Sequence, residues 1–423
     1  MIPYGKQQID QSDIDAVVEV LKSDFLTQGP MVPRFEQTIA RYCGVGDAVA
    51  VNSGTSALHI ACLALDLGPG DTLWTSPITF VASANCALYC GAKVDFVDID
   101  PATYNMSPEA LEEKLKQARE SKSLPKVVVP VHMCGQPCNM EAIHALAQEY
   151  DFRVIEDACH ALGGKYKQEP IGNCRYSDIT IFSFHPVKII TTGEGGMAVT
   201  NDQTLAERME LLRSHGITRN VTTYGSMGVR ESGSKTHPYA HTPIPPYTNT
   251  PKHPYIDTPK PAYYYEQIDL GFNYRMTDIQ AALGISQMKR LDQFVARRSQ
   301  LAARYDELLS DLPVTTPWQH PNGSSAWHLY VVRLDLEKMN LTRRQVFEYL
   351  RKKGIGINVH YIPVHTHPYY QAMGFEWGMF PESEKYYQEA ITLPLFPAMT
   401  EKEQDRVVDA LKRILPTEHT EGH

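Results

Sequence analysis

The chain has 423 residues, of which 43% are hydrophobic and 21% charged, with a net charge of -9. This composition is typical of a globular protein, and the length is sufficient for two domains. The acidic balance argues against a nucleic-acid-binding protein, which usually carries a basic surplus.

The N-terminus has no basic segment followed by an apolar run, and no apolar stretch reaches the roughly 18 residues of a membrane span. We therefore expect neither a secretory signal nor a transmembrane helix. The eight cysteines lie in the first half of the chain, mostly in apolar segments, as expected for buried thiols in a reducing cytoplasm. Cys134 and Cys138 lack a second cysteine pair, and His365 and His367 lack flanking carboxylates, so we expect no metal site.

In chain order, two helical patterns come first. Residues 11–21 carry apolar side chains at helical spacing, with Ser12 as the N-cap candidate, and a second helix follows the turn after residue 25. From Ala48 to about residue 184, apolar strand-like runs alternate with helical patterns. This alternation predicts βαβ units and a mostly parallel sheet, which binds ligands at the carboxyl ends of its strands.

The pattern then changes twice. Residues 233–264 form an imperfect eight-residue repeat of proline, threonine and tyrosine. Its prolines exclude a helix or central strand, and we expect an extended surface insertion at about 221–266, either a tolerated repeat or a lid or subunit contact. A smaller α+β region follows, with helices expected at 285–312, 343–355 and 401–415 and strands at 327–336 and 357–364. We therefore expect a large domain at 1–284, which includes the insertion, and a small domain at 285–423.

Lys188 follows an apolar strand and precedes a glycine-rich turn. A lone lysine is usually solvated, but these apolar neighbours predict an amine inside a pocket. Desolvation makes such an amine nucleophilic and suits it to form an imine with an aldehyde cofactor. Asp157 ends another apolar strand, where a buried carboxylate needs a cation such as a protonated pyridine nitrogen. The alternative for Asp157 is the N-cap of a helix at 158–162.

Residues 52–58 lie between a predicted strand and a predicted helix. The amides of a helix N-terminus, with the hydroxyls of Thr55 and Ser56, would form a phosphate cradle, although this signal is weak by itself. Ser183 would add a hydroxyl to the same phosphate. Phe80 follows another strand, where its ring would stack on a flat heterocycle, and the alternative is a core phenylalanine.

Together these segments resemble the DegT/DnrJ/StrS family of nucleotide-sugar aminotransferases over about residues 3–415, apart from the insertion. The resemblance implies a type I fold that binds pyridoxal 5'-phosphate (PLP), a homodimer, and L-glutamate as amino donor. The segments that carry it are NSGTSAL, PITFVASAN, VIEDACHALG, FSFHPVKIITTGEGGMAVT, RSHGITR, GFNYRMTDIQAALG, WHLYVVRL and INVHYIPVH.

Within the family, the chain is most similar to the subgroup that aminates C4 of a UDP-linked 4-keto-6-deoxy-N-acetyl hexosamine for pseudaminic acid. That similarity depends on DACHALG, which contains His160, and on FSFHPVK, RSHGI, PYGKQQI and FLTQGP. Members with histidine in place of the lysine are dehydratases, so Lys188 favours transamination.

The resemblance also implies a role for each matching residue. Lys188 would form the Schiff base with PLP and carry the proton, and Asp157 would bind the pyridine nitrogen. Gly54, Thr55 and Ser183 would bind the phosphate of PLP, with Ser56 as a weaker candidate. Phe80 and His160 would lie beside the PLP ring. Asn273 would reach the phosphate of the PLP bound to the other subunit. Arg219, His328 and Tyr361 would face the substrate, although His328 and Tyr361 equally fit packed strand residues.

The expected protein is therefore a cytoplasmic homodimer with shared active sites that acts on a nucleotide-linked keto sugar, without nucleic acid or membrane partners. Amination at C3 instead of C4, or of a dTDP- or GDP-linked sugar, is an alternative. A non-catalytic PLP-fold regulator and a PLP-dependent decarboxylase or lyase are further alternatives, and intact Lys188 and Asp157 argue against the regulator.

Overall fold

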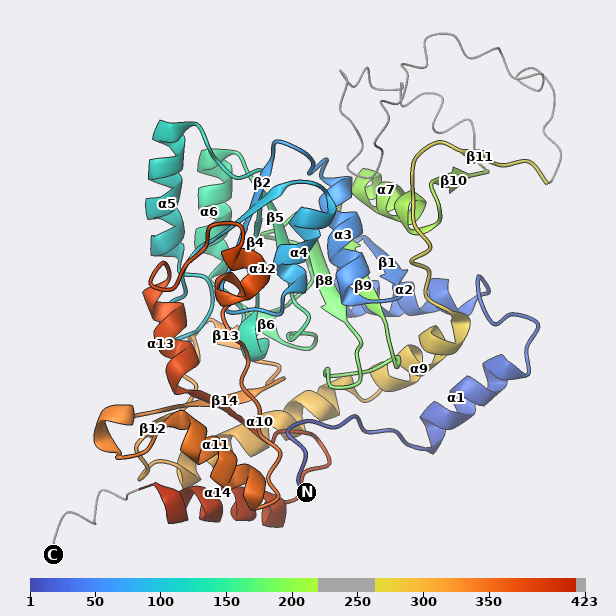
Figure 1. Ribbon diagram of the computed structural model, residues 1–423. Helices are drawn as coiled ribbons and strands as arrows, with labels where there is room; N and C mark the ends of the chain where they lie inside the picture. Colours follow the sequence, from blue (N-terminus) through green and yellow to red (C-terminus); the bar gives the residue numbers. More distant parts are fainter. Residues whose placement is uncertain (220–262, 416–423) are drawn as a thin grey trace, which may run out of the picture.

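The computed structural model describes residues 1–219 and 263–415, and a seven-stranded sheet forms its centre (Figure 1). All strands run in one direction except β9, which is antiparallel to both of its neighbours, so the predicted mostly parallel sheet is confirmed. The strands in spatial order are β1 (Asp47–Val51), β9 (Gly196–Thr200), β8 (Ile179–Ser183), β5 (Arg153–Asp157), β4 (Val127–Val129), β2 (Thr72–Thr75) and β3 (Lys93–Phe96).

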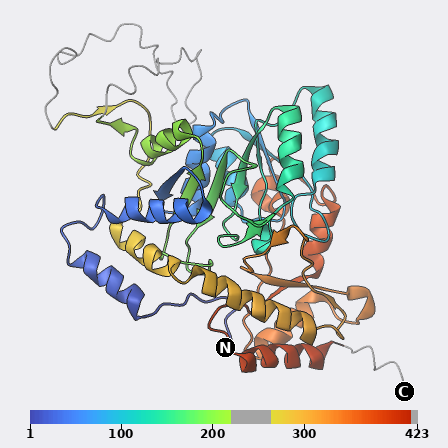
Figure 2. The same ribbon diagram turned by 180° about the vertical axis from the view of Figure 1, so that it is seen from behind.

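Helices cover both faces of this sheet, and Figures 1 and 2 show the two layers from opposite sides. Alternate residues of a strand pack against different layers: Val49 and Val51 pack with one set of helices, and Ala50 packs with the other. The first layer contains α3 (Gly54–Ala64), α4 (Ala82–Tyr89) and α7 (Gln203–Arg213). The second contains α2 (Met31–Cys43), α5 (Pro108–Ser121), α6 (Met140–Tyr150) and α9 (Asp278–Met288).

The first helix, α1 (Gln11–Leu21), has the predicted range, but its N-cap is Asp10 and not Ser12. The carboxylate of Asp10 accepts a hydrogen bond from the amide of Asp13, and the Asp13 carboxylate accepts one from the amide of Asp10. Ser12 lies inside the first turn, and its hydroxyl donates to Asp10 instead. This reciprocal arrangement is a capping box.

The C-terminal part has its own hydrophobic core between an antiparallel sheet and three helices, α10 (Leu291–Leu308), α11 (Arg343–Lys352) and α14 (Glu401–Ile414). The sheet is formed by β12 (Val314–Thr315), β14 (Tyr330–Leu334) and β15 (Ala390–Leu393). The remaining short strands and helices are β6 (Lys165–Tyr166), β7 (Glu169–Pro170), β10 (Ile217–Thr218), β11 (Glu266–Gln267), β13 (Gly323–Ser324), α12 (Pro368–Gln371), α13 (Pro381–Glu389) and the 3-10 helices η1 (Met133–Gly135), η2 (Leu336–Lys338) and η3 (Val364–Thr366).

Two expectations for this region were wrong. The helix expected at 285–312 is divided, because α9 ends at Met288 and α10 begins at Leu291. The strand expected at 357–364 is absent: Asn358 makes one isolated bridge with Thr392, and Pro363 has no amide to donate to a ladder.

α10 contributes to both the large and the small core, so the domain boundary at 284/285 stays a prediction. Most of the expected insertion at 221–266 lies outside the described residues.

Within residues 1–219 and 263–415, no helix is both long and apolar enough to cross a membrane. The eight cysteines are free thiols, and all are buried except Cys159, which is partly exposed. The same part of the chain has no group of three or more side chains that could hold a metal ion.

Candidate active site

A cavity of about 900 Å³ lies at the carboxyl ends of β5 and β8, whose last residues, Asp157 and Ser183, are both on its wall. Most of the residues singled out from the sequence line this one cavity: Gly54, Thr55, Ser56, Phe80, Asp157, His160, Ser183, Lys188, His328 and Tyr361. Asn273 and Arg219 do not line it, and both are exposed.

Lys188 lies in the connection between β8 and β9, at residues 184–195, and its half-buried side chain points into the cavity. Its amine has no hydrogen-bond or ion-pair partner among the described residues. Burial lowers the pKa of this amine, although the nearby Cys159 and Asp157 side chains partly oppose that shift. A lowered pKa increases the neutral fraction of this amine, and the neutral form is a nucleophile and a proton acceptor.

Asp157 is buried, and its carboxylate accepts two hydrogen bonds. The Ser83 hydroxyl donates to Oδ2 at 2.6 Å, and the Cys159 amide donates to Oδ1 at 3.1 Å. No lysine or arginine in the described part of the chain forms an ion pair with it. Residues 159–163 form a turn and no helix follows Asp157 there, so its interpretation as a helix N-cap was wrong. A buried carboxylate without a cation is costly, and a cationic ring nitrogen would complete it.

The N-terminus of α3 forms an open anion site. Ser53 is the N-cap, and its hydroxyl accepts the amide of Ser56 at 3.1 Å, whereas the amides of Gly54 and Thr55 have no acceptor among the described residues. A Cβ atom on Gly54 would lie 3.0 Å from Cβ of Ser183, so glycine allows the helix to approach the end of β8. The Ser56 hydroxyl already donates to Asn52 at 2.7 Å and is therefore less available to a phosphate.

Aromatic side chains form the opposite wall. Phe80 is 58% exposed, so the interpretation as a core residue was wrong. The rings of His160 and His328 are buried with centroids 4.3 Å apart, and Tyr361 is hydrogen-bonded to Nε2 of His160 at 3.2 Å. The Nδ1 atoms of both histidines have no partner among the described residues.

Both histidines are neutral at neutral pH. Burial is the main cause that holds their pKa values well below the ordinary value, and the charge of Lys188 adds to it. A neutral imidazole presents one donor and one acceptor, which suits hydroxyl and carbonyl groups. His328 and Tyr361 both line the cavity, and neither lies in a strand.

The donor set fits PLP. The cavity combines an unpartnered amine, a buried carboxylate that lacks a cation, free amides at a helix N-terminus and an exposed aromatic ring. These groups match an aldehyde, a pyridine nitrogen, a phosphate and a flat ring face, in that order.

Sequence reasoning missed Ser83, a buried residue behind the cavity wall that holds the Asp157 carboxylate. It lies three residues after Phe80 on α4, and only the packing of that helix brings it to β5. The residues that line the cavity and were missed include Tyr4, Asn52, Cys159, His185, Glu194, Gln280, Asn358 and His360.

Comparisons with known proteins agree with this geometry. The family model described as the DegT/DnrJ/EryC1/StrS aminotransferase family matches residues 7–412. The spore coat polysaccharide biosynthesis protein SpsC of Bacillus subtilis is 38% identical over 418 residues, which are 98% of this chain and 97% of SpsC.

Two solved structures are similar over nearly their whole length. Helicobacter pylori PseC, an aminotransferase involved in the biosynthesis of pseudoaminic acid, has a TM-score of 0.82 and 29% identity over 98% of each chain. The PLP form of Spr1654, a putative sugar aminotransferase from Streptococcus pneumoniae, has a TM-score of 0.81 and 26% identity over 98% of each chain. The present chain therefore belongs to the DegT/DnrJ/EryC1/StrS aminotransferase family and is a PLP-dependent sugar aminotransferase.

Proposed function

We propose that the enzyme transfers the amino group of L-glutamate to C4 of a UDP-linked 4-keto-6-deoxy-N-acetyl hexosamine, for pseudaminic acid or a related surface glycan. The observation that carries this proposal is the convergence of Lys188, Asp157 and the α3 N-terminus in one cavity of about 900 Å³. This volume is in the range of sites that enclose a cofactor or a substrate of similar size. Similarity to PseC supports the sugar class.

When bound, PLP supplies an electron-withdrawing ring that takes up the electron pair released at the reacting carbon. In our proposal, Gly54, Thr55 and Ser183 hold its phosphate, Phe80 covers its ring, and Asp157 holds its nitrogen. Nζ of Lys188, whose pKa burial lowers, accepts a proton from the carbon that bears the donor amine and returns a proton to the sugar carbon.

The scarcity of cationic side chains on the cavity wall supports a homodimer with shared active sites. Among the described residues that line the cavity, Lys188 is the only lysine or arginine. A glutamate carboxylate and a nucleotide diphosphate both need cations or amide donors. We propose that Arg219 and Asn273, which lie off the cavity of their own chain, serve the cavity of the other subunit. His328 and Tyr361 would contact the sugar, and His160 would lie beside the cofactor ring. The free cysteine thiols support a cytoplasmic location.

A second candidate substrate follows from the higher identity to SpsC, 38% against 29% for PseC. It is a keto sugar for a spore-coat type of polysaccharide, with amination at C3 or C4 and a UDP, dTDP or GDP carrier.

A panel of UDP-, dTDP- and GDP-linked 3-keto and 4-keto sugars, incubated with glutamate, separates the two candidates. We expect C4 amination of the UDP-linked N-acetyl hexosamine, identified by mass spectrometry and NMR. Transfer only to 3-keto sugars or to other carriers would favour the second candidate, and transfer only to free keto acids would refute a sugar acceptor. The Lys188→Ala variant is the control for uncatalysed transfer.

A further inference from the structure

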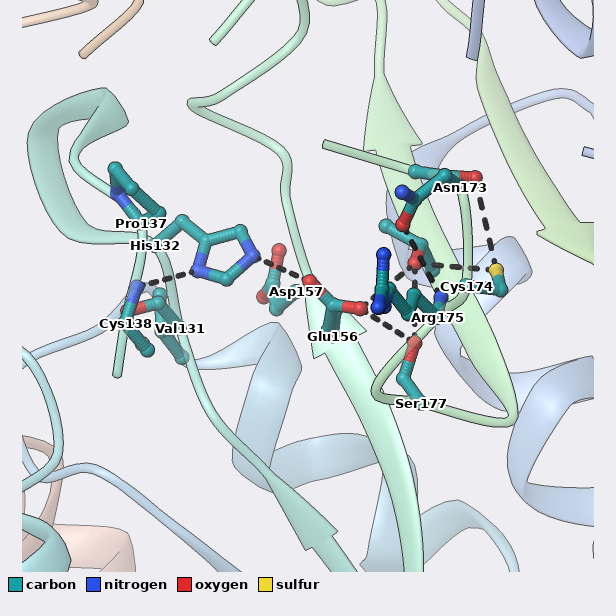
Figure 3. Close-up of polar contacts among 12 residues, drawn as sticks. Val131, His132, Pro137, Cys138, Glu156, Asp157, Asn173, Cys174, Arg175 and Ser177 are labelled. Carbon is teal, nitrogen blue, oxygen red and sulfur yellow. Dashed lines mark hydrogen bonds and ion pairs between the residues drawn. The ribbon is translucent and has the colours of Figure 1, made fainter. Parts of the chain in front are cut away.

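A buried polar network lies behind the cavity, on the other side of β5 (Figure 3). Successive residues of a strand point to opposite faces. Asp157 faces the cavity, and Glu156 faces away from it, toward His132. Glu156 is 5% exposed and His132 is fully buried, and neither has a part in the proposed chemistry.

The hydrogen bonds of the network define the orientation of each group. The Cys138 amide donates to Nδ1 of His132 at 3.1 Å, so this nitrogen is an acceptor and Nε2 carries the proton. Nε2 donates to Oε2 of Glu156 at 2.7 Å. On the other side, the hydroxyl groups of Ser177 and Thr180 donate to Oε1. Burial opposes ionisation of Glu156, but these donors outweigh it and hold its pKa below the ordinary value.

The same network reaches the backbone of Asp157. The amide of His132 donates to the carbonyl oxygen of Asp157 at 3.0 Å, and the amide of Asp157 donates to the carbonyl oxygen of Pro130 at 2.9 Å. His132 thus holds two consecutive residues of β5, Glu156 through its ring and Asp157 through its main chain. The end of β5 cannot rotate about its axis without breaking one of these bonds.

We propose that His132 is a positioning residue, which acts through Glu156 to keep the carboxylate of Asp157 aimed into the cavity at the cofactor nitrogen. The proposal rests on the role of Asp157 given under the proposed function. A small displacement of the Asp157 carboxylate would weaken its interaction with the ring nitrogen, because that interaction depends on a short distance and good alignment.

Two amide variants of His132 separate its two ring bonds. Glutamine places a nitrogen close to the position of Nε2 and keeps a donor for Glu156, whereas asparagine places its oxygen close to Nδ1 and keeps only the acceptor for the Cys138 amide. We expect His132→Gln to bind PLP like the wild type. We expect His132→Asn to bind it roughly tenfold more weakly and to shift the pH at which the visible absorbance of the bound cofactor changes.

The measurements are titration of cofactor-free enzyme with PLP, visible absorbance against pH, and thermal unfolding of the cofactor-free proteins. Equal affinity and spectra in the two His132 variants, with an altered Asp157→Asn variant, would overturn the positioning role and leave the role of Asp157 intact. An unaltered Asp157→Asn variant would refute the role of Asp157 itself. If His132→Asn does not fold, Ser177→Ala removes another donor to Glu156: a smaller shift in the same direction supports the proposal, and no shift overturns it.

Discussion

The cofactor-free enzyme is expected to lose stability in mild acid, and His360 accounts for a calculable part of that loss. His360 lies on the cavity wall, is 6% exposed, and is hydrogen-bonded through Nδ1 to the Thr392 hydroxyl at 2.8 Å. Burial, followed by the charge of Lys188, lowers its pKa to about 3. The ordinary value of about 6.5 applies to the unfolded chain, so between these values the unfolded state binds the extra proton. Stability is therefore complete above about pH 6.5 and falls as the pH decreases toward 3.

Integration of this proton uptake from about pH 7.5 to about pH 4.5 gives a loss of about 2–3 kcal/mol from His360 alone. The assay is urea unfolding of the wild type and the His360→Asn variant, cofactor-free and at one protein concentration, at both pH values. Asparagine retains a hydrogen-bonding partner for Thr392 but does not titrate, so only the wild type binds an extra proton at residue 360 when it unfolds in mild acid. We expect the wild type to lose about 2–3 kcal/mol more than the variant. Equal losses would refute the burial argument for His360.

Three further predictions concern single side chains. Lys188→Ala should abolish turnover and the absorbance band of the covalently bound cofactor, and turnover in that variant would contradict the assignment. Gly54→Ala should weaken PLP binding roughly tenfold but leave binding of unphosphorylated pyridoxal nearly unchanged. The reason is that the new methyl group lies 3.0 Å from Cβ of Ser183 and crowds the phosphate site at the α3 N-terminus. Equal losses of affinity for the two ligands in titrations would contradict a phosphate site there. Arg298→Met should lower the free energy of unfolding by about 2–4 kcal/mol. The buried guanidinium donates to the carbonyl oxygens of Trp327, His328 and Leu395, and methionine would leave them without a donor. A change below about 0.5 kcal/mol in urea unfolding would contradict this prediction.

The local architecture was predictable because strands, turns and helices leave periodic patterns. The apolar run that ends at Asp157 and the Ser-Gly-Thr start of α3, with Ser53 as its N-cap, are both where the patterns predicted them. Ser83 and His360 could not be found in the same way, because a serine inside a helix or a histidine in an extended segment has no local signal. Their proximity to Asp157 and Lys188 arises from packing between segments far apart in the chain. The N-cap of α1 was missed because two aspartates formed the capping box in place of Ser12.

The departure of β9 from the parallel pattern explains how Lys188 reaches the cavity. A helical crossover after β8 would have carried residues 184–195 away over one face of the sheet. Instead β9 returns antiparallel beside β8, with Ser183 opposite Gly196, so the connection stays at the carboxyl end where Asp157 lies. A Cβ atom on Gly196 would lie 2.3 Å from the carbonyl oxygen of Ser53, so glycine there lets β9 begin directly against the start of α3. The path of the backbone through the glycine-rich turn after Lys188 therefore places the amine of Lys188, the carboxylate of Asp157 and the N-terminus of α3 at one edge of the sheet. The spacing of these residues along the sequence did not reveal this arrangement.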